Sequence, residues 1–425
     1  MNRFVRSTLV GTFTLLSLLS TAPPVSTQET APMPEALATP DGFGVRSADG
    51  SFVLRLRGGI QYDGRLFAED PNESLVNQFQ IRRARADITG TLYQDYDFRI
   101  FVDFAGSRVE LLDAYGNLRL TPALQVRVGK MKGPVGLERL QSGFSNLFAE
   151  RAFPTALVPN RDIGVQLHGV LGGGTAEYQL GLFNGVPDGG SADGDDGDSK
   201  DIAARVFVTP FGATDIPAIR GLGVGIAATS GEQNGTAALP ALAPYRTAGR
   251  EIFFRYRNDG SAAGTAAAQG RRTRISPQAS WFFKGIGALA EYVSVRQSVT
   301  RNGTVAELTN TAWQTTASLV LTGENATFRG VIPARDFDLG EGRWGAVQLV
   351  ARVNKLSVDE ESFPLYSNPD HAAQEALGLG AGLNWHLNRA VLLLVNYEHT
   401  EFAAAPGGAV RDDENVLVGR VQVTF

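Results

Sequence analysis

Arginine dominates the chemistry that this sequence offers. Of the 39 basic residues in the 425-residue chain, only five are Lys. A guanidinium presents paired donors in a flat fork that fits two oxygens of a tetrahedral oxyanion. A genomic base composition that favours Arg, Ala and Gly explains part of this bias, but it does not explain where the arginines stand. Eight of them share one face of the predicted strands: Arg55, Arg57, Arg65, Arg83, Arg85, Arg99, Arg119 and Arg127.

This basic face is opposed by an apolar one. The basic face also carries Asp63, Asp87, Asp103 and Asp113, which leaves a surplus of four positive charges. An arginine facing lipid at mid-membrane would cost about 2–4 kcal/mol, so we expect the basic face to line an interior. Such a wall raises the local concentration of anions, although the formal net charge of the whole chain is −5.

The elements that position these side chains are long strands with a period of two. Residues 51–67 place Leu54, Ile60 and Leu66 on one face for about twice the usual length of a strand in a soluble sandwich. The pattern predicts an all-β fold, a transmembrane antiparallel β-barrel of about 16 strands. The predicted strands are 51–67, 83–92, 98–104, 110–120, 124–132, 161–171, 175–184, 201–209, 221–230, 271–283, 287–299, 308–322, 344–357, 376–387, 390–402 and 415–425.

Two long connections bear on the interior. The segment Glu251–Arg257 would make the strand number odd, and we assign it to the long loop 231–270. Residues 133–160 carry too much apolar surface to lie in water, so we expect this loop to fold into the barrel. It would then place Arg139 and Arg151 at a constriction. The alternatives are a loop that caps the outside or packs at a subunit interface.

The two ends of the chain point to export. Arg3 and Arg6 precede an apolar run from Leu9 to Leu19, which predicts a signal peptide over residues 1–27. Residues 28–50 are expected to form a flexible periplasmic segment, and residues 51–425 the barrel. The terminal Phe425 resembles the signal that the barrel-assembly machinery reads. We therefore expect the protein in the lipid of the bacterial outer membrane.

Other chemistry finds little support in the sequence. There is no Cys, and the four His residues show no spacing typical of a hydrolase. His168 and the glycines at 378, 380 and 382 are interpreted as structural. The acidic run over 185–200 lacks the ligand spacing of an EF-hand and is expected outside the pore, although calcium binding there stays an alternative. We predict no cofactor, no metal and no nucleic-acid partner.

Short motifs occur in chain order from about residue 51 to the C-terminus: Ile81–Ala84, Leu112–Ala114, Val128–Lys130, Gly136–Glu138, Glu150–Arg151, Arg161–Gln166, Phe183–Gly185, Leu321–Glu324 and Asn384–Asn388. Together they resemble the phosphate-selective porin O/P family. The resemblance implies a homotrimer of 16-stranded barrels with an arginine ladder leading phosphate to a constriction. It assigns the ladder pair to Arg82 and Arg83, the site acid to Asp113 and a constriction cation to Arg151. Arg139 stands where phosphate-specific members carry Lys. Arg246, Arg250, Arg255 and Arg257 are candidates for the outer loops.

The sequence thus favours a porin that passes small anions by passive diffusion, with a preference for phosphate-like oxyanions. A general porin without that preference is the first alternative. An outer-membrane enzyme or a structural or adhesive barrel is the second. The predicted pathway comprises Arg55, Arg57, Arg82, Arg83, Arg85, Arg99, Arg127 and Asp113, with Arg139 and Arg151 at the constriction.

Overall fold

The computed structural model describes residues 33–39, 42–68, 75–194 and 198–425. Every helix and strand among them belongs to the compact unit Pro34–Phe425. No helix in these ranges is long and apolar enough to cross a membrane. The signal peptide expected over residues 1–27 lies outside the described residues.

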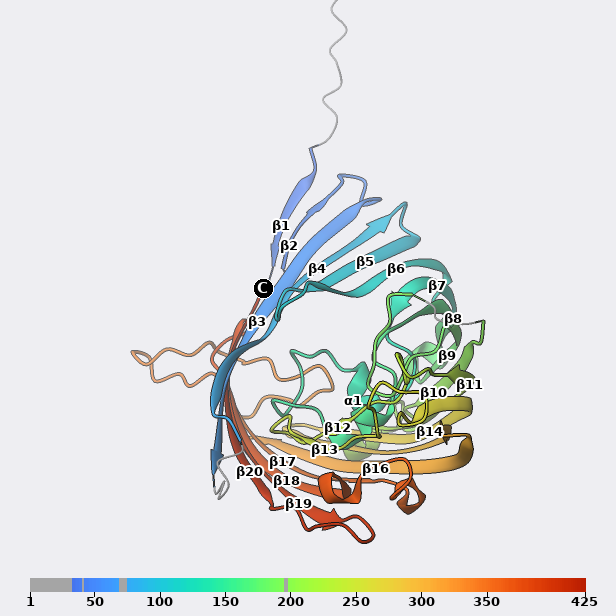
Figure 1. Cartoon of the computed structure of the whole chain (residues 1–425). Coiled ribbons are helices and arrows are strands. Elements are labelled where there is room, and N and C mark those ends of the chain that lie inside the picture. The colour runs from blue at the N-terminus through green and yellow to red at the C-terminus, as the bar shows by residue number, and fades with distance from the viewer. Residues whose placement is uncertain (1–32, 40–41, 69–74, 195–197) are drawn as a thin grey trace, which may run out of the picture. The chain divides into compact units, whose positions relative to one another are not determined.

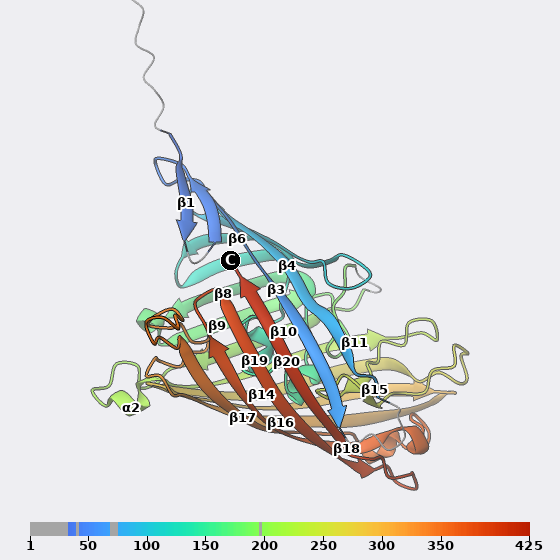
Figure 2. The ribbon, with the colours of Figure 1, turned by 90° about the vertical axis from the view of Figure 1, so that its left-hand side faces the viewer.

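Sixteen antiparallel strands form a closed barrel. Each pairs with its neighbours in chain order, and the last strand pairs with the first, from Thr424 opposite Gly59 to Asn415 opposite Ala68 (Figures 1 and 2). The predicted fold and strand number are therefore confirmed. The barrel strands are β3 (Val53–Ala68), β4 (Gln78–Leu92), β5 (Tyr96–Asp103), β6 (Glu110–Thr121), β7 (Leu124–Met131), β8 (Asp162–Leu171), β9 (Ala176–Phe183), β10 (Asp201–Val208), β11 (Leu222–Asn234), β14 (Ala267–Phe283), β15 (Ile286–Arg301), β16 (Thr304–Val320), β17 (Ala346–Ser357), β18 (Ala373–His386), β19 (Val391–Ala404) and β20 (Glu414–Thr424).

Burial alternates along these strands as the sequence predicts. In β3, Leu54 and Ile60 are about half exposed on the outside, whereas Asp63 and Arg65 are fully buried on the inside. Apolar side chains on the outer face and charged ones on the inner face reverse the usual arrangement of a soluble protein. This reversal is the arrangement of a barrel surrounded by lipid.

The structure corrects the expectation of a flexible segment over residues 28–50. Within that segment, β1 (Glu35–Thr39) and β2 (Gly42–Arg46) form an antiparallel hairpin, and β2 pairs with the start of β3. The physical reason is an uncovered edge. Strand β20 pairs with β3 only from Gly59 onward, so the backbone groups of the first residues of β3 are left for β2.

Connections are mostly short at one end of the barrel and long at the other. We call the end with the β4–β5 and β6–β7 turns the short-turn end, and the opposite one the long-loop end. Each end has exceptions: residues 209–221 and 321–345 form longer segments at the short-turn end, and Asn302–Gly303 make a tight turn at the long-loop end. The remaining short elements are α1 (Leu137–Leu140), η1 (Phe153–Leu157), η2 (Gly172–Gly174), α2 (Pro217–Arg220), β12 (Tyr245–Arg246), β13 (Ile252–Phe254), η3 (Glu360–Ser362) and η4 (Pro369–His371).

Two of the long loops fill part of the interior. Figure 1 shows α1, β12 and β13 inside the ring of strands. Glu251–Arg257 is no part of the barrel wall, as predicted, and β13 pairs only with β12. Phe153 of the loop 133–160 packs edge-on against Phe253 at 5.7 Å, in an apolar cluster against the inner faces of β15–β18. The prediction that the loop 133–160 folds inward is confirmed.

Candidate functional site

The inward-folded loop is fixed by side chains of the barrel wall. Buried backbone groups need partners, and inward-facing Asn, Gln and Glu residues supply them. Asn354 accepts a hydrogen bond from Phe153 N at 3.0 Å, and Asn396 accepts one from Ala149 N at 2.8 Å. These contacts hold the loop against the wall of β15–β20, so the remaining space lies on the side of β4–β8.

That remaining space is a basic cavity of about 630 Å³ between the loop and the inner faces of β4–β8. Ten basic and three acidic residues line it among the described residues, a formal surplus of seven positive charges. Eight of the ten predicted site residues are among the lining residues. The basic residues are Arg82, Arg83, Arg85, Arg99, Arg127, Lys132, Arg139, Arg151, Arg161 and Arg250, and the acidic ones are Asp103, Glu110 and Asp113.

A β-bulge explains how two consecutive arginines reach this cavity. Successive side chains of a regular strand point to opposite faces. The register of β3 and β4 shifts at this point, because Gln61 lies opposite Arg83 while Tyr62 lies opposite Ile81. Arg82 is the extra residue, and both it and Arg83 turn inward.

Four of the cavity's ten basic residues are neutralised by carboxylates. Arg82 donates to Glu150 of the loop at 2.5 Å, and Arg85 donates to Asp103 at 2.7 Å. Asp113 receives Arg99 at 3.1 Å and Arg161 at 3.0 Å, with Arg99 also bound to Asp87. Asp113 therefore holds two guanidinium groups in place.

Five of the other six basic residues meet only neutral oxygens or a ring within the described chain. Arg83 donates to Gln61, Lys132 to two loop carbonyls, and Arg151 to the carbonyls of residues 138 and 141. Arg139 donates to Asn160 and to the carbonyl of residue 155. Arg127 lies over the ring of Tyr115 at 4.5 Å. Neutral partners leave each of these positive charges without a counterion.

Burial and the dense positive charge of the loop lower the pKa of its arginines. Burial, together with Arg151 and Arg161, lowers the pKa of Arg139 to about 9. Burial, with repulsion by Arg161 and Arg85 and partial compensation by Glu138, lowers the pKa of Arg151 to about 10. Both groups are still cations at neutral pH. A bound anion would relieve the repulsion that lowers these values.

The basic lining continues toward the short-turn end. Arg55 and Arg57 lie with Arg127 around a smaller cavity of about 280 Å³. Arg127 and Tyr115 line both cavities, so the two are contiguous. Each of the ten predicted site residues thus lines one or both of these two adjoining cavities. Arg65 and Arg119, which the alternation also placed inside, pair with acids and do not line the larger cavity.

Three basic lining residues were missing from the predicted site. Lys132 directly precedes the loop, and its signal was the scarcity of Lys, since two of the five stand at 130 and 132. Arg161 lies in a family-like motif and at the first position of the predicted strand 161–171; in the structure it directly precedes β8 and lines the cavity. Arg250, one of four outer-loop candidates, reaches the cavity, whereas Arg246, Arg255 and Arg257 do not line it.

The structure corrects the placement of the acidic loop outside the pore. Asp188 is partly buried and accepts from Arg274 at 2.7 Å, and Gly189 N donates to the carbonyl of Val158. A fully buried arginine on β14 requires a counterion, and this loop provides it. Asp195 and Asp196 lie outside the described residues. Among the residues that the structure describes, no cluster of side chains is suited to a metal ion.

Comparisons with known proteins agree with this architecture. The family model for phosphate-selective porins O and P matches residues 54–425. Curated proteins give no significant match by sequence. Among solved structures, the anion-selective porin from Comamonas acidovorans has a TM-score of 0.56 at 10% identity, covering 88% of this chain and 100% of that one. The outer membrane channel DcaP of Acinetobacter baumannii has a TM-score of 0.55 at 12% identity, covering 90% and 99%. OmpT of Vibrio cholerae has a TM-score of 0.56 at 10% identity, covering 92% and 100%.

Proposed function

The chain belongs to the phosphate-selective porin O and P family, and we propose that this outer-membrane porin passes small anions with a preference for phosphate or related oxyanions. The observation that carries the proposal is the formal surplus of seven positive charges around the cavity beside the loop. Charge of one sign in a narrow aqueous passage concentrates the opposite ion. Guanidinium forks add directional donors for the oxygens of a tetrahedral anion.

The constriction is the part of this proposal that decides selectivity. Arg139 and Arg151 come from the loop, whereas Arg83 comes from the wall of β4. None of the three has a carboxylate partner among the residues that the structure describes. We infer that an anion exchanges its water for donors from both sides as it passes between the loop and the wall.

Two alternative functions are an outer-membrane enzyme and a general porin. Membership of a porin family makes the chain a channel, not an enzyme. A general porin without phosphate preference stays the competing function, because Arg139 replaces the compact ammonium of phosphate-specific members by a flat fork. The surplus of unpaired cations favours an anion pathway over an unselective one. Oligomerisation as a homotrimer, contact with outer-membrane lipid and insertion by the barrel-assembly machinery belong to the same proposal.

Ion selectivity in planar lipid bilayers tests the proposal. Under a KCl gradient, the wild-type channel should give a reversal potential of the sign that chloride permeation produces. Arg83→Gln, Arg139→Gln and Arg151→Gln should each move that potential toward zero. Added phosphate should reduce the chloride current of the wild type more than that of the variants.

The matched control is Arg296→Gln, because Arg296 is an exposed arginine paired with Glu307 away from the cavity. Its reversal potential should equal that of the wild type. A cation-selective wild type would overturn the anion pathway. A chloride current indifferent to phosphate would instead favour the general porin.

A further inference from the structure

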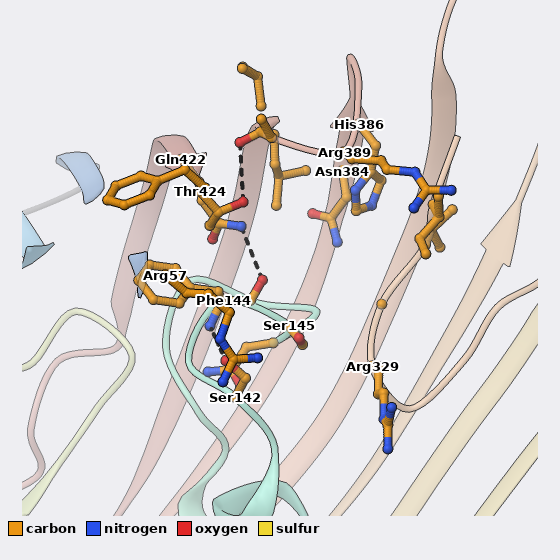
Figure 3. A pocket seen from close by; sticks show the side chains of 18 of the residues that line it. Arg57, Ser142, Phe144, Ser145, Arg329, Asn384, His386, Arg389, Gln422 and Thr424 are labelled. Atoms are coloured by element: carbon orange, nitrogen blue, oxygen red, sulfur yellow. Dashed lines mark hydrogen bonds between the residues drawn. The ribbon is translucent and has the colours of Figure 1, made fainter. Parts of the chain in front are cut away.

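A second cavity lies below the constriction, at the short-turn end. It has a volume of about 350 Å³ and opens between the loop residues 142–147, the segment 329–332 and the ends of β18–β20. Figure 3 shows Arg57 and Phe144 on one side of it and His386 and Arg389 on the other. It shares Arg99 and Ser142 with the larger cavity, so a solute leaving the constriction can enter it.

The walls of this second cavity hold polar atoms without partners. Asn146 is 6% exposed, and neither its amide nitrogen nor its amide oxygen has a hydrogen-bond partner among the described residues. Asn384 is 2% exposed; its Nδ2 donates to the carbonyl of Leu147, but its Oδ1 is without a partner in the described chain. His386 Nε2 is likewise unpartnered there. Buried groups of this kind are uncommon in a folded protein and call for a ligand or ordered water.

The unpartnered atoms specify the chemistry of a ligand. Two amide oxygens need donors, which only hydroxyl or N–H groups supply, whereas the Asn146 amide nitrogen needs an acceptor. Arg329 and Arg389 line the same cavity as exposed cations, and no ion pair with a described acid involves either of them. Phe144 and the terminal Phe425 add apolar surface. The cavity thus combines positive charge, oxygens that can accept hydrogen bonds from hydroxyl groups, and an apolar wall. This combination fits an organic oxyanion better than inorganic phosphate.

We propose that this second cavity is a binding site for a small hydroxylated organic oxyanion, such as the phosphate monoester of a short polyol. Arg329 and Arg389 would take the anionic group. Asn146, Asn384 and His386 would take the hydroxyl groups. A cavity of this size holds a solute of a few heavy atoms. The proposal rests on the proposed function only in that the ligand arrives through the anion pathway.

Calorimetric titration of the folded full-length protein in detergent tests the site without requiring conduction. The probe is glycerol 3-phosphate, with glycerol and inorganic phosphate as separate titrants. We expect Asn146→Leu to weaken glycerol 3-phosphate binding at least tenfold and to leave inorganic phosphate binding unchanged. The variant should fold, because the Asn146 side chain makes no hydrogen bond that Leu would remove.

The charge requirement is tested by a pair of arginine variants. Arg329→Gln should weaken glycerol 3-phosphate binding, whereas Arg335→Gln, an exposed arginine of the same segment outside the cavity, should not. Equal affinity in wild type and Asn146→Leu would overturn the site. Binding of glycerol as tight as that of its phosphate would overturn the ligand class, as would a parallel loss of inorganic phosphate binding. Each of these failures leaves the reversal potential, and thus the proposed function, untouched.

Discussion

Replacing Glu150 with Gln should weaken the fold and strengthen the anion preference at the same time. Glu150 lies on the inward-folded loop, where one of its carboxylate oxygens accepts from Arg65 at 2.7 Å and from Arg82 at 2.5 Å. Although burial raises the pKa of Glu150, Arg82 and Arg83 hold it well below its usual range, so the group is an anion. Gln keeps the shape but turns an N–H group toward guanidinium donors, and the charge is lost.

The size of both effects follows from the contacts. Removing one partner of a buried ion pair costs about 3–5 kcal/mol. Because Arg352 and several Asn residues also hold the loop, we expect the free energy of unfolding to fall by about 3 kcal/mol, the lower end of that range. One added positive charge acts on an anion about 7 Å away through water with about 0.6 kcal/mol. That is close to the thermal energy, so the local anion concentration rises up to about threefold, and less at high salt.

Two assays and a matched variant separate these effects. Thermal unfolding followed by circular dichroism in detergent reports stability, and the reversal potential under a KCl gradient reports selectivity. Glu398→Gln is the control, since Glu398 accepts from Arg352 at 2.5 Å in a buried pair that does not line the basic cavity. Both variants should unfold earlier, but only Glu150→Gln should become more anion-selective. A lower anion preference in Glu150→Gln, or an equal shift in both variants, would refute the reasoning.

Three further predictions follow from the same site and its support. Burial and neighbouring cations lower the pKa of Lys132 well below its usual range. Raising the pH through this lowered pKa should remove a positive charge and reduce anion selectivity, and Lys132→Met should flatten this pH dependence of the reversal potential. Phe153→Ala removes apolar packing under the loop, so it should lower the free energy of unfolding by about 3–5 kcal/mol and raise single-channel conductance. Phe104→Ala, at an exposed ring, should change neither. Gly129 has φ +126°, and a Cβ there would lie 2.2 Å from a backbone oxygen of β6. Gly129→Ala should therefore reduce the yield of folded protein, measured by its heat-modifiable migration on gels. Gly419→Ala, with open space around the glycine, should not.

The barrel itself was predictable because its outer face contacts lipid and its inner face contacts water. Lipid outside and water inside impose a period of two on every strand, and a slip of one residue would reverse the whole pattern. The inward loop was predictable for a related reason, since Phe148 and Phe153 have no other apolar surface to reach. The β1–β2 hairpin was not, because it depends on where β20 stops covering β3, and no residue in 28–50 encodes that point.

Ion pairs between distant segments were also beyond the sequence. Alternation places Arg65 and Arg83 on the inner face alike, yet Arg65 is fully buried against Asp63 and Glu150 while Arg83 lines the cavity with a neutral partner. The difference arises from the loop, whose Glu150 reaches one arginine and not the other. A count of inward charges therefore overstates the number of cations that an anion meets.

The bulges show most clearly how pairing, and not residue order, builds the site. Regular alternation would turn Arg82 and Arg83 to opposite faces of the strand. Both can belong to the expected arginine ladder only if the strand register shifts between them. The slip occurs there, and a second one at Leu112 turns Leu112 and Asp113 inward together. Both slips border the basic cavity, where each adds an inward side chain that a regular strand would have sent to lipid. A bulge is fixed by the pairing of two strands. The number of side chains that face this cavity is therefore a property of the closed barrel and not of any single strand.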